Sequence, residues 1–133
     1  MSNVALRFNQ GKPKCGYILH YPKVAEVIAR ILEVGEVKYE PFNWKKGGNS
    51  DFSYLNATMR HLFKFVNGDE FDEEFGTSHL GHAIWNLMTM FELNDHECMD
   101  KDKFNSALAE LKEKTNDNRT TTRSKTAICC HQG

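Results

Sequence analysis

The sequence predicts an all-α fold, a bundle of about four to five helices followed by a flexible C-terminal tail. Three segments carry this prediction, because apolar residues recur in each at the spacing of a helical turn. Short loops join them, and no convincing strand pattern or internal repeat occurs. The chain has 133 residues, enough for one domain with its own core. We expect that domain over residues 1–114 and the tail over residues 115–133.

The composition is that of an ordinary soluble protein, with 40% hydrophobic and 26% charged residues. The formal net charge of −1 argues against a broad basic surface for duplex nucleic acid, but it leaves room for a small anionic ligand. No apolar run approaches the roughly 18 residues of a membrane span, and the first residues lack the apolar region of a signal peptide. A cytoplasmic location, with no membrane partner, is therefore the default expectation.

The four cysteines, Cys15, Cys98, Cys129 and Cys130, show no C-x-x-C spacing. A structural zinc site usually draws its ligands from two closely spaced pairs. We therefore expect free thiols, as is usual in the cytosol.

The first 21 residues form an expected arm, in which cations alternate with turn-forming residues. Arg7, Lys12 and Lys14 are the cations, and Gly11 and Pro13 favour turns over regular structure. Apolar side chains in this arm give it something to bury, so we expect it to be ordered. No Walker phosphate-binding loop can be written here.

The first helix is expected to begin at Pro22, because proline suits the first turn of a helix, and to end near Tyr39–Pro41. Its apolar residues recur at helical spacing and are Val24, Val27, Ile28, Ile31, Leu32 and Val34. A loop with Asn43 and Trp44 follows.

The second helix is expected to begin at a cap provided by Asp51 or Ser53, and to end at Asn67-Gly68. Its apolar stripe consists of Leu55, Met59, Leu62, Phe63 and Val66. Arg60, His61 and Lys64 lie on the flanks of this stripe.

The third helix is expected to begin after Thr77 or Ser78. Its apolar side consists of Leu80, Ala83, Ile84, Leu87, Met88 and Phe91. A polar line of His79, His82 and Asn86 shares this apolar helix, and buried polar groups need partners. A shorter fourth helix is expected over residues 104–114, before the composition turns polar.

Glu33 and Glu36 lie three residues apart and therefore share one face of the first helix. Carboxylate oxygens suit Mg²⁺ or Mn²⁺, and imidazole in the same shell favours Mn²⁺. We therefore expect Glu33 and Glu36 to converge with His79 and His82 on a divalent metal ion. Such a metal ion can clamp phosphate oxygens and generate hydroxide from water. The alternatives are a solvated acidic face and hydrogen-bonded core histidines.

Substrate contacts are expected from cations and aromatic rings near these acids. Arg60, Lys38 and Lys64 are candidates to hold phosphates as charge-assisted donors. Trp44 and Tyr39 offer rings for base stacking, although Trp44 is equally suited to be a hydrophobic plug.

Four short motifs follow one another in order along the chain. They are Arg7-Phe8-Asn9-Gln10-Gly11-Lys12-Pro13, then Val34-Gly35-Glu36-Val37-Lys38-Tyr39 with Asn43-Trp44, then Arg60-His61-Leu62, then His79-Leu80-Gly81-His82-Ala83 with Asn86. This ordered series, over about residues 5–93, resembles the phage and bacterial dATP/dGTP diphosphohydrolases, which are similar to the MazG-like, all-α nucleoside triphosphate pyrophosphohydrolases.

This resemblance implies hydrolysis of a purine (deoxy)nucleoside triphosphate to the monophosphate and pyrophosphate, with Mg²⁺ or Mn²⁺. For a MazZ-like member the substrate would be dGTP or GTP, and the dGMP formed would supply modified purine synthesis in a phage. A homodimer or homotetramer is implied as well. The site residues implied are Glu33, Glu36 and Lys38 for catalysis; Glu33, Glu36, His79 and His82 for the metal; and Arg7, Lys12, Lys38, Tyr39, Asn43, Trp44, Arg60, Lys64 and Asn86 for the substrate.

The chain departs from the broader MazG-like pattern at one point. That pattern has E-x-x-E on one helix and E-x-x-D on a later one, whereas His79 and His82 occupy the later pair here. Asp72 or Glu73 is an alternative source of the missing carboxylate. An HD-domain phosphohydrolase is set aside, because the chain has no His-Asp dipeptide. A non-catalytic helical module that binds a nucleotide or protein is the remaining alternative.

Overall fold

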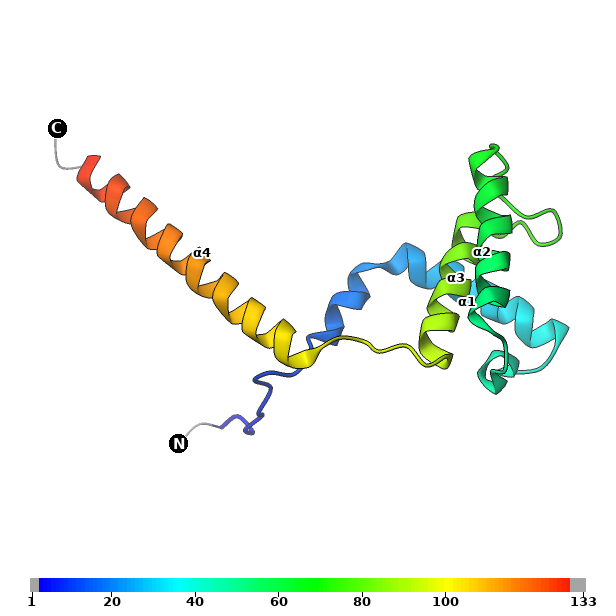
Figure 1. The fold of residues 1–133 in the computed structure, drawn as a ribbon, viewed down its shortest axis with the longest axis horizontal. Helices are drawn as coiled ribbons and strands as arrows, with labels where there is room; N and C mark the ends of the chain where they lie inside the picture. Colours follow the sequence, from blue (N-terminus) through cyan, green and yellow to red (C-terminus); the bar gives the residue numbers. More distant parts are fainter. Residues whose placement is uncertain (1–2, 130–133) are drawn as a thin grey trace. The chain divides into compact units, whose positions relative to one another are not determined.

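The computed structural model describes the backbone of residues 3–129 and the side chains of residues 3–123 (Figure 1). Within that range the chain is helical, and its one β feature is an isolated bridge between Phe71 and Ser78. The elements are η1 (Cys15–His20), α1 (Pro22–Lys38), η2 (Asn43–Lys46), α2 (Asp51–Val66), α3 (His79–Leu93) and α4 (Lys101–Cys129), where η marks a 3-10 helix. The all-α prediction is confirmed.

The chain divides into two compact units, residues 1–95 and 96–133. The first unit contains α1, α2 and α3. The second contains α4, a helix that runs on to Cys129 and therefore well past the end expected at residue 114. Beyond that point Thr115 and Thr120 donate their hydroxyls to carbonyls one turn back. Residues 130–133, the last part of the expected tail, lie outside the described residues.

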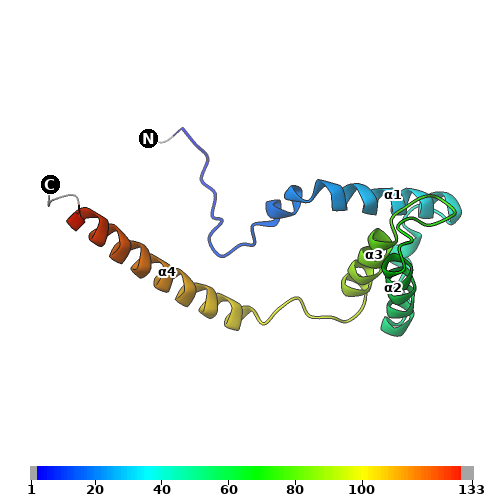
Figure 2. The same cartoon turned by 90° about the horizontal axis from the view of Figure 1, so that it is seen from above.

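Helices α2 and α3 form an antiparallel hairpin (Figures 1 and 2). Ser50 caps α2 by accepting a hydrogen bond from the backbone N–H of Ser53, and Ser78 caps α3 in the same way from Gly81. At the open end of the hairpin the Asn94 side chain donates to Asp51 at 2.7 Å. Ser78 was one of the two caps expected for α3; the other, Thr77, has a different role.

Helix α1 packs against α3 through a glycine. A Cβ atom on Gly81 would lie 2.4 Å from Cγ2 of Val27, so the two backbones approach as closely as only glycine permits. Ile28 and Ile31 are the buried apolar residues of α1. The position of Pro22 at the start of α1 confirms the expected beginning of this helix.

The core of the hairpin is unexpectedly polar. His79, Asn86 and Thr89 of α3 are buried, and Thr58 of α2 joins them. Of the apolar side identified for α3 from the sequence, only Ala83 is buried. Four others, Leu80, Leu87, Met88 and Phe91, are exposed. Small and hydrogen-bonded side chains allow the helices to approach, and the bulky apolar residues are left on the outside.

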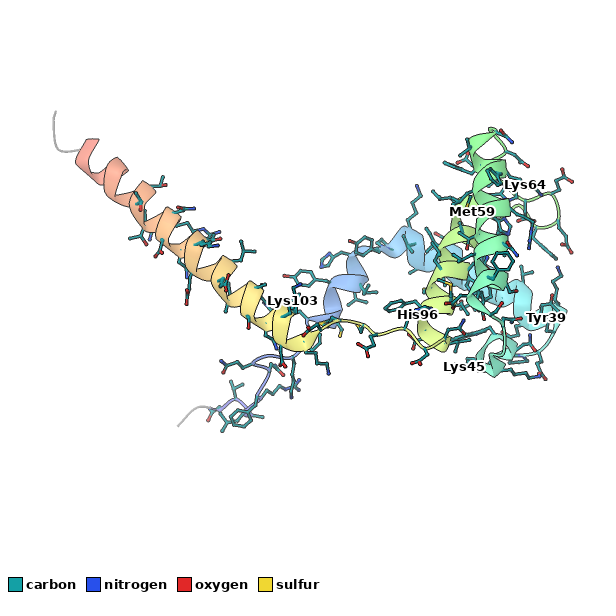
Figure 3. The ribbon with its side chains drawn as sticks, in the orientation of Figure 1. Tyr39, Lys45, Met59, Lys64, His96 and Lys103 are labelled. Atoms are coloured by element: carbon teal, nitrogen blue, oxygen red, sulfur yellow. The ribbon has the colours of Figure 1, made fainter. Side chains whose placement is uncertain are left out.

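The apolar stripe of α2 is likewise mostly exposed: Phe63 is 61% exposed, and Met59, which is labelled in Figure 3, is 45% exposed. None of the helices in the described range is long and apolar enough to cross a membrane. Cys15 and Cys98 are free and exposed, as expected, whereas the side chains of Cys129 and Cys130 lie outside the described residues.

Candidate functional site

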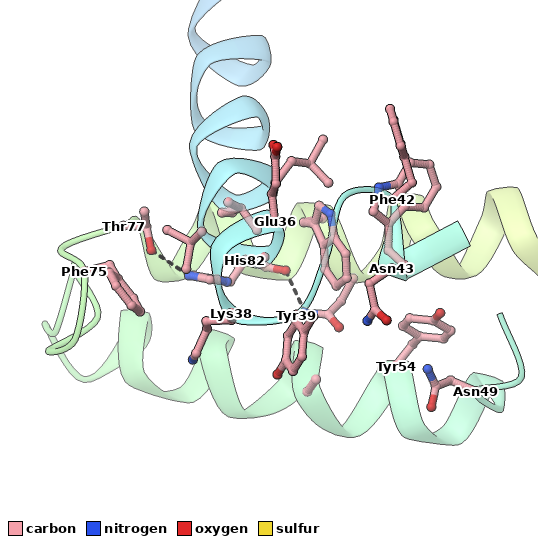
Figure 4. Close-up of a pocket in the computed structure, with 18 of the residues that line it drawn as sticks. Glu36, Lys38, Tyr39, Phe42, Asn43, Asn49, Tyr54, Phe75, Thr77 and His82 are labelled. Atoms are coloured by element: carbon pink, nitrogen blue, oxygen red, sulfur yellow. Dashed lines mark hydrogen bonds between the residues drawn. The ribbon is translucent and has the colours of Figure 1, made fainter. Parts of the chain in front are cut away.

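A cavity of about 910 Å³ opens in the first unit (Figure 4). Its walls come from the C-terminal half of α1, the loop containing η2, one side of α2, the loop before α3, and the first two turns of α3. Small-molecule sites in proteins have volumes of roughly 300–1,000 Å³, so this cavity is large enough for a ligand of nucleotide size.

Aromatic rings supply much of the apolar wall. The aromatic residues that line the cavity are Tyr39, Phe42, Trp44, Tyr54, Phe75 and Trp85. Phe42 adopts a left-handed backbone conformation with φ of 59°, which is costly for a residue with a side chain. The turn that this conformation makes leads directly into η2, which carries Asn43 and Trp44 to the cavity.

Three cations line the same cavity, and they differ in their partners. Lys38 forms an ion pair with Glu74 at 3.2 Å and lies over the Phe75 ring, while Lys46 pairs with Glu40. Arg60 forms no ion pair with any residue of the described part of the chain. Arg60 is therefore the cation most available to an incoming anion.

The loop between α2 and α3 is organised by the side chain of Asp72. Its Oδ1 accepts hydrogen bonds from the backbone N–H groups of Glu74 and Phe75, and its Oδ2 accepts from the N–H and the hydroxyl of Thr77. Partial burial raises the pKa of Asp72, but these hydrogen bonds to the charged form outweigh it and hold the pKa well below its usual range. Asp72 is therefore an ionised residue that shapes the loop.

Three histidines meet where this loop reaches the hairpin. The ring of His61 stacks on that of His82, with centroids 4.5 Å apart, and its Nδ1 lies 2.9 Å from Nδ1 of His79. Nε2 of His82 lies 2.7 Å from the hydroxyl of Thr77. Nε2 of His79 is buried without a hydrogen bond, 3.5 Å from Asp69.

The environment of His61 and His82 favours the neutral form of these two imidazoles. Burial, followed by the neighbouring positive charges of His82 and His79, lowers the pKa of His61 to about 4. Burial also lowers the pKa of His82, although the nearby Asp72 carboxylate acts in the opposite direction. At neutral pH, His61 and His82 therefore carry lone pairs that can accept hydrogen bonds.

The two acids expected on α1 have different positions. Glu36 lines the cavity, whereas Glu33 does not and instead accepts from Arg30 at 3.0 Å on the exposed side of the helix. Asp72, one alternative carboxylate, lines the cavity but is used by its loop. The other alternative, Glu73, is exposed and lies outside the cavity lining.

The cavity brings together many of the residues expected at the site from sequence. They are Glu36, Lys38, Tyr39, Asn43, Trp44, Arg60, His82 and Asn86. The expected residues that do not line it are Arg7, Lys12, Glu33, Lys64 and His79. Arg7 and Lys12 are exposed on the N-terminal arm, Lys64 is exposed on α2, and His79 is buried behind His61.

The described residues of one chain do not form a complete metal site. Among the residues that the structure describes, no three His, Cys, Asp or Glu side chains are placed to hold a metal ion. The expected ligands Glu33, Glu36, His79 and His82 are divided between the surface, the cavity and the core. Mg²⁺, however, is usually held by one or two carboxylates together with substrate phosphates and waters. Glu36 fits that smaller requirement.

His61 and Thr77 are two of the cavity residues for which the sequence patterns predict no role in the site. The sequence places His61 on the flank of the apolar stripe of α2, whereas the structure shows that it lines the cavity, as does Ala57 one helical turn before it. Thr77 was considered only as a helix cap. Their positions in the sequence relative to His82 could have indicated this role. Thr77 comes five residues before His82, and an α2–α3 hairpin places His61 opposite the first turns of α3.

This arrangement is an all-α domain in which aromatic rings, acceptor histidines and an arginine without an ion pair among the described residues surround one cavity. It is typical of a site for a phosphorylated small molecule with a ring system. The chain belongs to the family described as dATP/dGTP diphosphohydrolase, N-terminal, whose model matches residues 2–103.

One relative is a protein of Salmonella phage PMBT28 named dATP/dGTP diphosphohydrolase, which is 32% identical over 109 residues. The match covers 81% of this chain and 36% of the relative, so the chain spans about a third of the relative's length. No solved structure matches the chain.

Proposed function

We propose that this chain hydrolyses a purine deoxynucleoside or nucleoside triphosphate, in the first place dGTP or GTP, to the monophosphate and pyrophosphate. Membership of the family and the name of the phage relative support the substrate class. The observation that carries the proposal is that one cavity holds both an aromatic wall and an arginine without an ionic partner among the described residues. A role in phage nucleotide metabolism, in the host cytoplasm, is part of the proposal.

The phosphates are assigned to the end of the cavity near Arg60 and Lys38. A guanidinium binds phosphate oxygens through two parallel hydrogen bonds, and it keeps its charge at every relevant pH. Lys38 is half-exposed, and among the described residues its ion pair is with the exposed Glu74. Exchange of this exposed pair for a phosphate costs little, because surface ion pairs contribute at most about 1 kcal/mol.

The purine is assigned to the aromatic wall. Trp44 and Tyr39 lie on either side of Phe42 in the loop that follows α1 and present rings to the cavity. Asn43, between them, and Asn49 carry amides that can both donate to and accept from a base edge. Such contacts discriminate between guanine and adenine, which differ in the donors and acceptors on their edges.

In the reaction, a water oxygen forms a bond to the α-phosphorus while the bond from that phosphorus to the bridging oxygen breaks. The bridging oxygen leaves with pyrophosphate, and the proton of the water is released. Mg²⁺ or Mn²⁺, held by Glu36 and the substrate phosphates, would neutralise charge that develops on the phosphate oxygens. Glu33 is the second acid proposed for that metal, on the same helix but off the cavity.

A homodimer is also proposed, because the α2–α3 hairpin leaves a broad apolar face uncovered. That face is lined by Phe52, Leu55, Met59, Phe63, Leu80 and Leu87, all exposed. It lies on the side of α3 away from Gly81, which contacts α1. Contiguous apolar faces of this kind mark association surfaces. A second copy would convert two hairpins into a four-helix bundle.

The experiment is incubation of the full chain with each dNTP and NTP in the presence of Mg²⁺ or Mn²⁺, followed by separation of the products. We expect monophosphate and pyrophosphate in equal amounts, with purines preferred. Orthophosphate alone would mean that another bond is broken. Absence of turnover with every triphosphate would favour the non-catalytic binding module.

Variants of the α1 acids locate the chemistry. Glu36→Gln is expected to abolish turnover, whereas Glu26→Gln, an exposed change on the same helix away from the cavity, serves as the matched control. The turnover of Glu33→Gln shows whether the second acid takes part: a loss of turnover would include Glu33 in the site, and unchanged turnover would exclude it. Retained turnover in Glu36→Gln, with helicity unchanged, would remove Glu36 from the site.

A further inference from the structure

Three side chains that line the cavity, those of Asp72, Thr77 and His82, form a continuous hydrogen-bonded chain. The Thr77 hydroxyl contacts Oδ2 of Asp72, and the same hydroxyl lies 2.7 Å from Nε2 of His82 (Figure 4). His82 and Asp72 are also close directly, with Nε2 and Oδ2 3.7 Å apart. The chain therefore runs from the loop before α3 to an imidazole that lines the cavity.

The supply of protons along this chain is limited. The Asp72 carboxylate can only accept, and the N–H groups of Glu74, Phe75 and Thr77 already point at it. The Thr77 hydroxyl has one proton, which it donates to Asp72. Only lone pairs of that hydroxyl are then left for His82, so the proton in the contact between Thr77 and His82 belongs to Nε2 of the imidazole.

The His82 ring is also held mechanically. The ring of His61 stacks face to face on it, with an interplanar angle of 7°. This contact covers a face of the His82 ring and not its two nitrogens, which lie at the ring edge. The imidazole therefore has one orientation as well as one position for its proton.

We infer that Thr77 and Asp72 are positioning residues, which fix His82 as the Nε2–H tautomer and leave the lone pair of Nδ1 as the acceptor that His82 offers to the cavity. The group accepted would be a hydrogen-bond donor in the cavity, the attacking water or an N–H or O–H of the nucleotide. The kinetic consequence of this inference rests on the proposed hydrolysis, whereas the hydrogen-bond arrangement itself does not.

The two parts of the inference are tested separately, and the first test uses the full chain with isotopically labelled histidine. The nitrogen spectrum near pH 7 is recorded for wild type, for Thr77→Val, which keeps the shape but loses the hydroxyl, and for Thr77→Ser, which keeps the hydroxyl. His82→Gln assigns the signal. We expect a protected Nε2–H in wild type and Thr77→Ser, and about tenfold faster exchange of this proton with water in Thr77→Val. A proton on Nδ1 in wild type, or equal protection in all three chains, would overturn the inference.

The second test compares kinetics of the same variants with the preferred triphosphate. We expect Thr77→Val to lower kcat by about tenfold or more with KM little changed, while Thr77→Ser stays near wild type. Equal losses in both variants would show a merely structural role, and a change confined to KM would place Thr77 in substrate binding; either result contradicts the inference. If wild type turns over no triphosphate, the proposed function fails, and the proton measurement alone then decides whether the tautomer assignment holds.

Discussion

The Nδ1 atoms of His61 and His79 lie 2.9 Å apart, so one imidazole donates and the other accepts. If both rings were protonated, two N–H groups would face each other at this distance. The pair therefore stays intact only while at least one ring is neutral. This contact joins α2 to the first residue of α3, and it links the stability of the hairpin to pH.

Acidification is expected to weaken the fold through His61. Its pKa falls from 6.5 to about 4 on folding, because burial and neighbouring positive charges disfavour the charged ring. The stability contributed by the neutral ring is complete above pH 6.5 and is lost as the pH falls from about 6.5 to about 4. Urea unfolding at a series of pH values should show this decline, and His61→Gln should reduce it. The exposed His20→Gln is the control and should leave the decline in the free energy of unfolding unchanged. A decline in His61→Gln as steep as in wild type, or a smaller decline in His20→Gln, would contradict the assignment to His61.

Gly81→Ala is expected to destabilise the protein by about 1–3 kcal/mol, because the new methyl group would meet Val27 of α1. Gly35→Ala, in α1 itself, is the matched control: nothing lies within 4 Å of its Cβ position, so the helix gains about 0.5–1 kcal/mol from alanine. Thermal and urea unfolding of both variants measure the difference. Equal effects of the two substitutions would mean that α1 does not pack on α3 at Gly81.

Arg60→Gln is expected to raise KM for the triphosphate by about 10- to 100-fold, the effect of a lost charge-assisted hydrogen bond. Lys64→Gln, one helical turn further on and off the cavity, should have a smaller effect. Steady-state kinetics at fixed ionic strength measure both. A larger effect for Lys64 than for Arg60 would place the phosphates outside the cavity.

The uncovered face of the hairpin leads to a prediction about association. Wild type is expected to run as a dimer in size-exclusion chromatography with light scattering, and the double variant Leu55→Glu, Leu87→Glu as a monomer, because charges on this face oppose its burial. Val37→Glu, at an apolar α1 residue that is 87% exposed and away from this face, is the control and should leave the mass unchanged. A wild-type monomer would refute the proposed dimer.

Much of the local structure could be predicted from the sequence. The periodicity of apolar residues, the proline at the start of α1 and the serine before α3 determine where the helices lie, because these signals act over one or two turns. The family motifs likewise identified the class of protein. These features are properties of neighbouring residues.

Which face of each helix points into the core was decided only by the tertiary structure. Helix α3 carries both an apolar stripe and a polar line, and periodicity does not tell which one meets α1 and α2. Of the polar line, His79 and Asn86 are buried and His82 is half-buried at the cavity. This side of α3 faces inward because His79 contacts His61 of α2 and Gly81 allows Val27 of α1 to approach, and these partners lie 18 and 54 positions away in the chain. The difference between Glu36, at the cavity, and Glu33, beside Arg30, has the same origin. A residue's spacing fixes its face on the helix, but only the packing of distant segments fixes what that face meets.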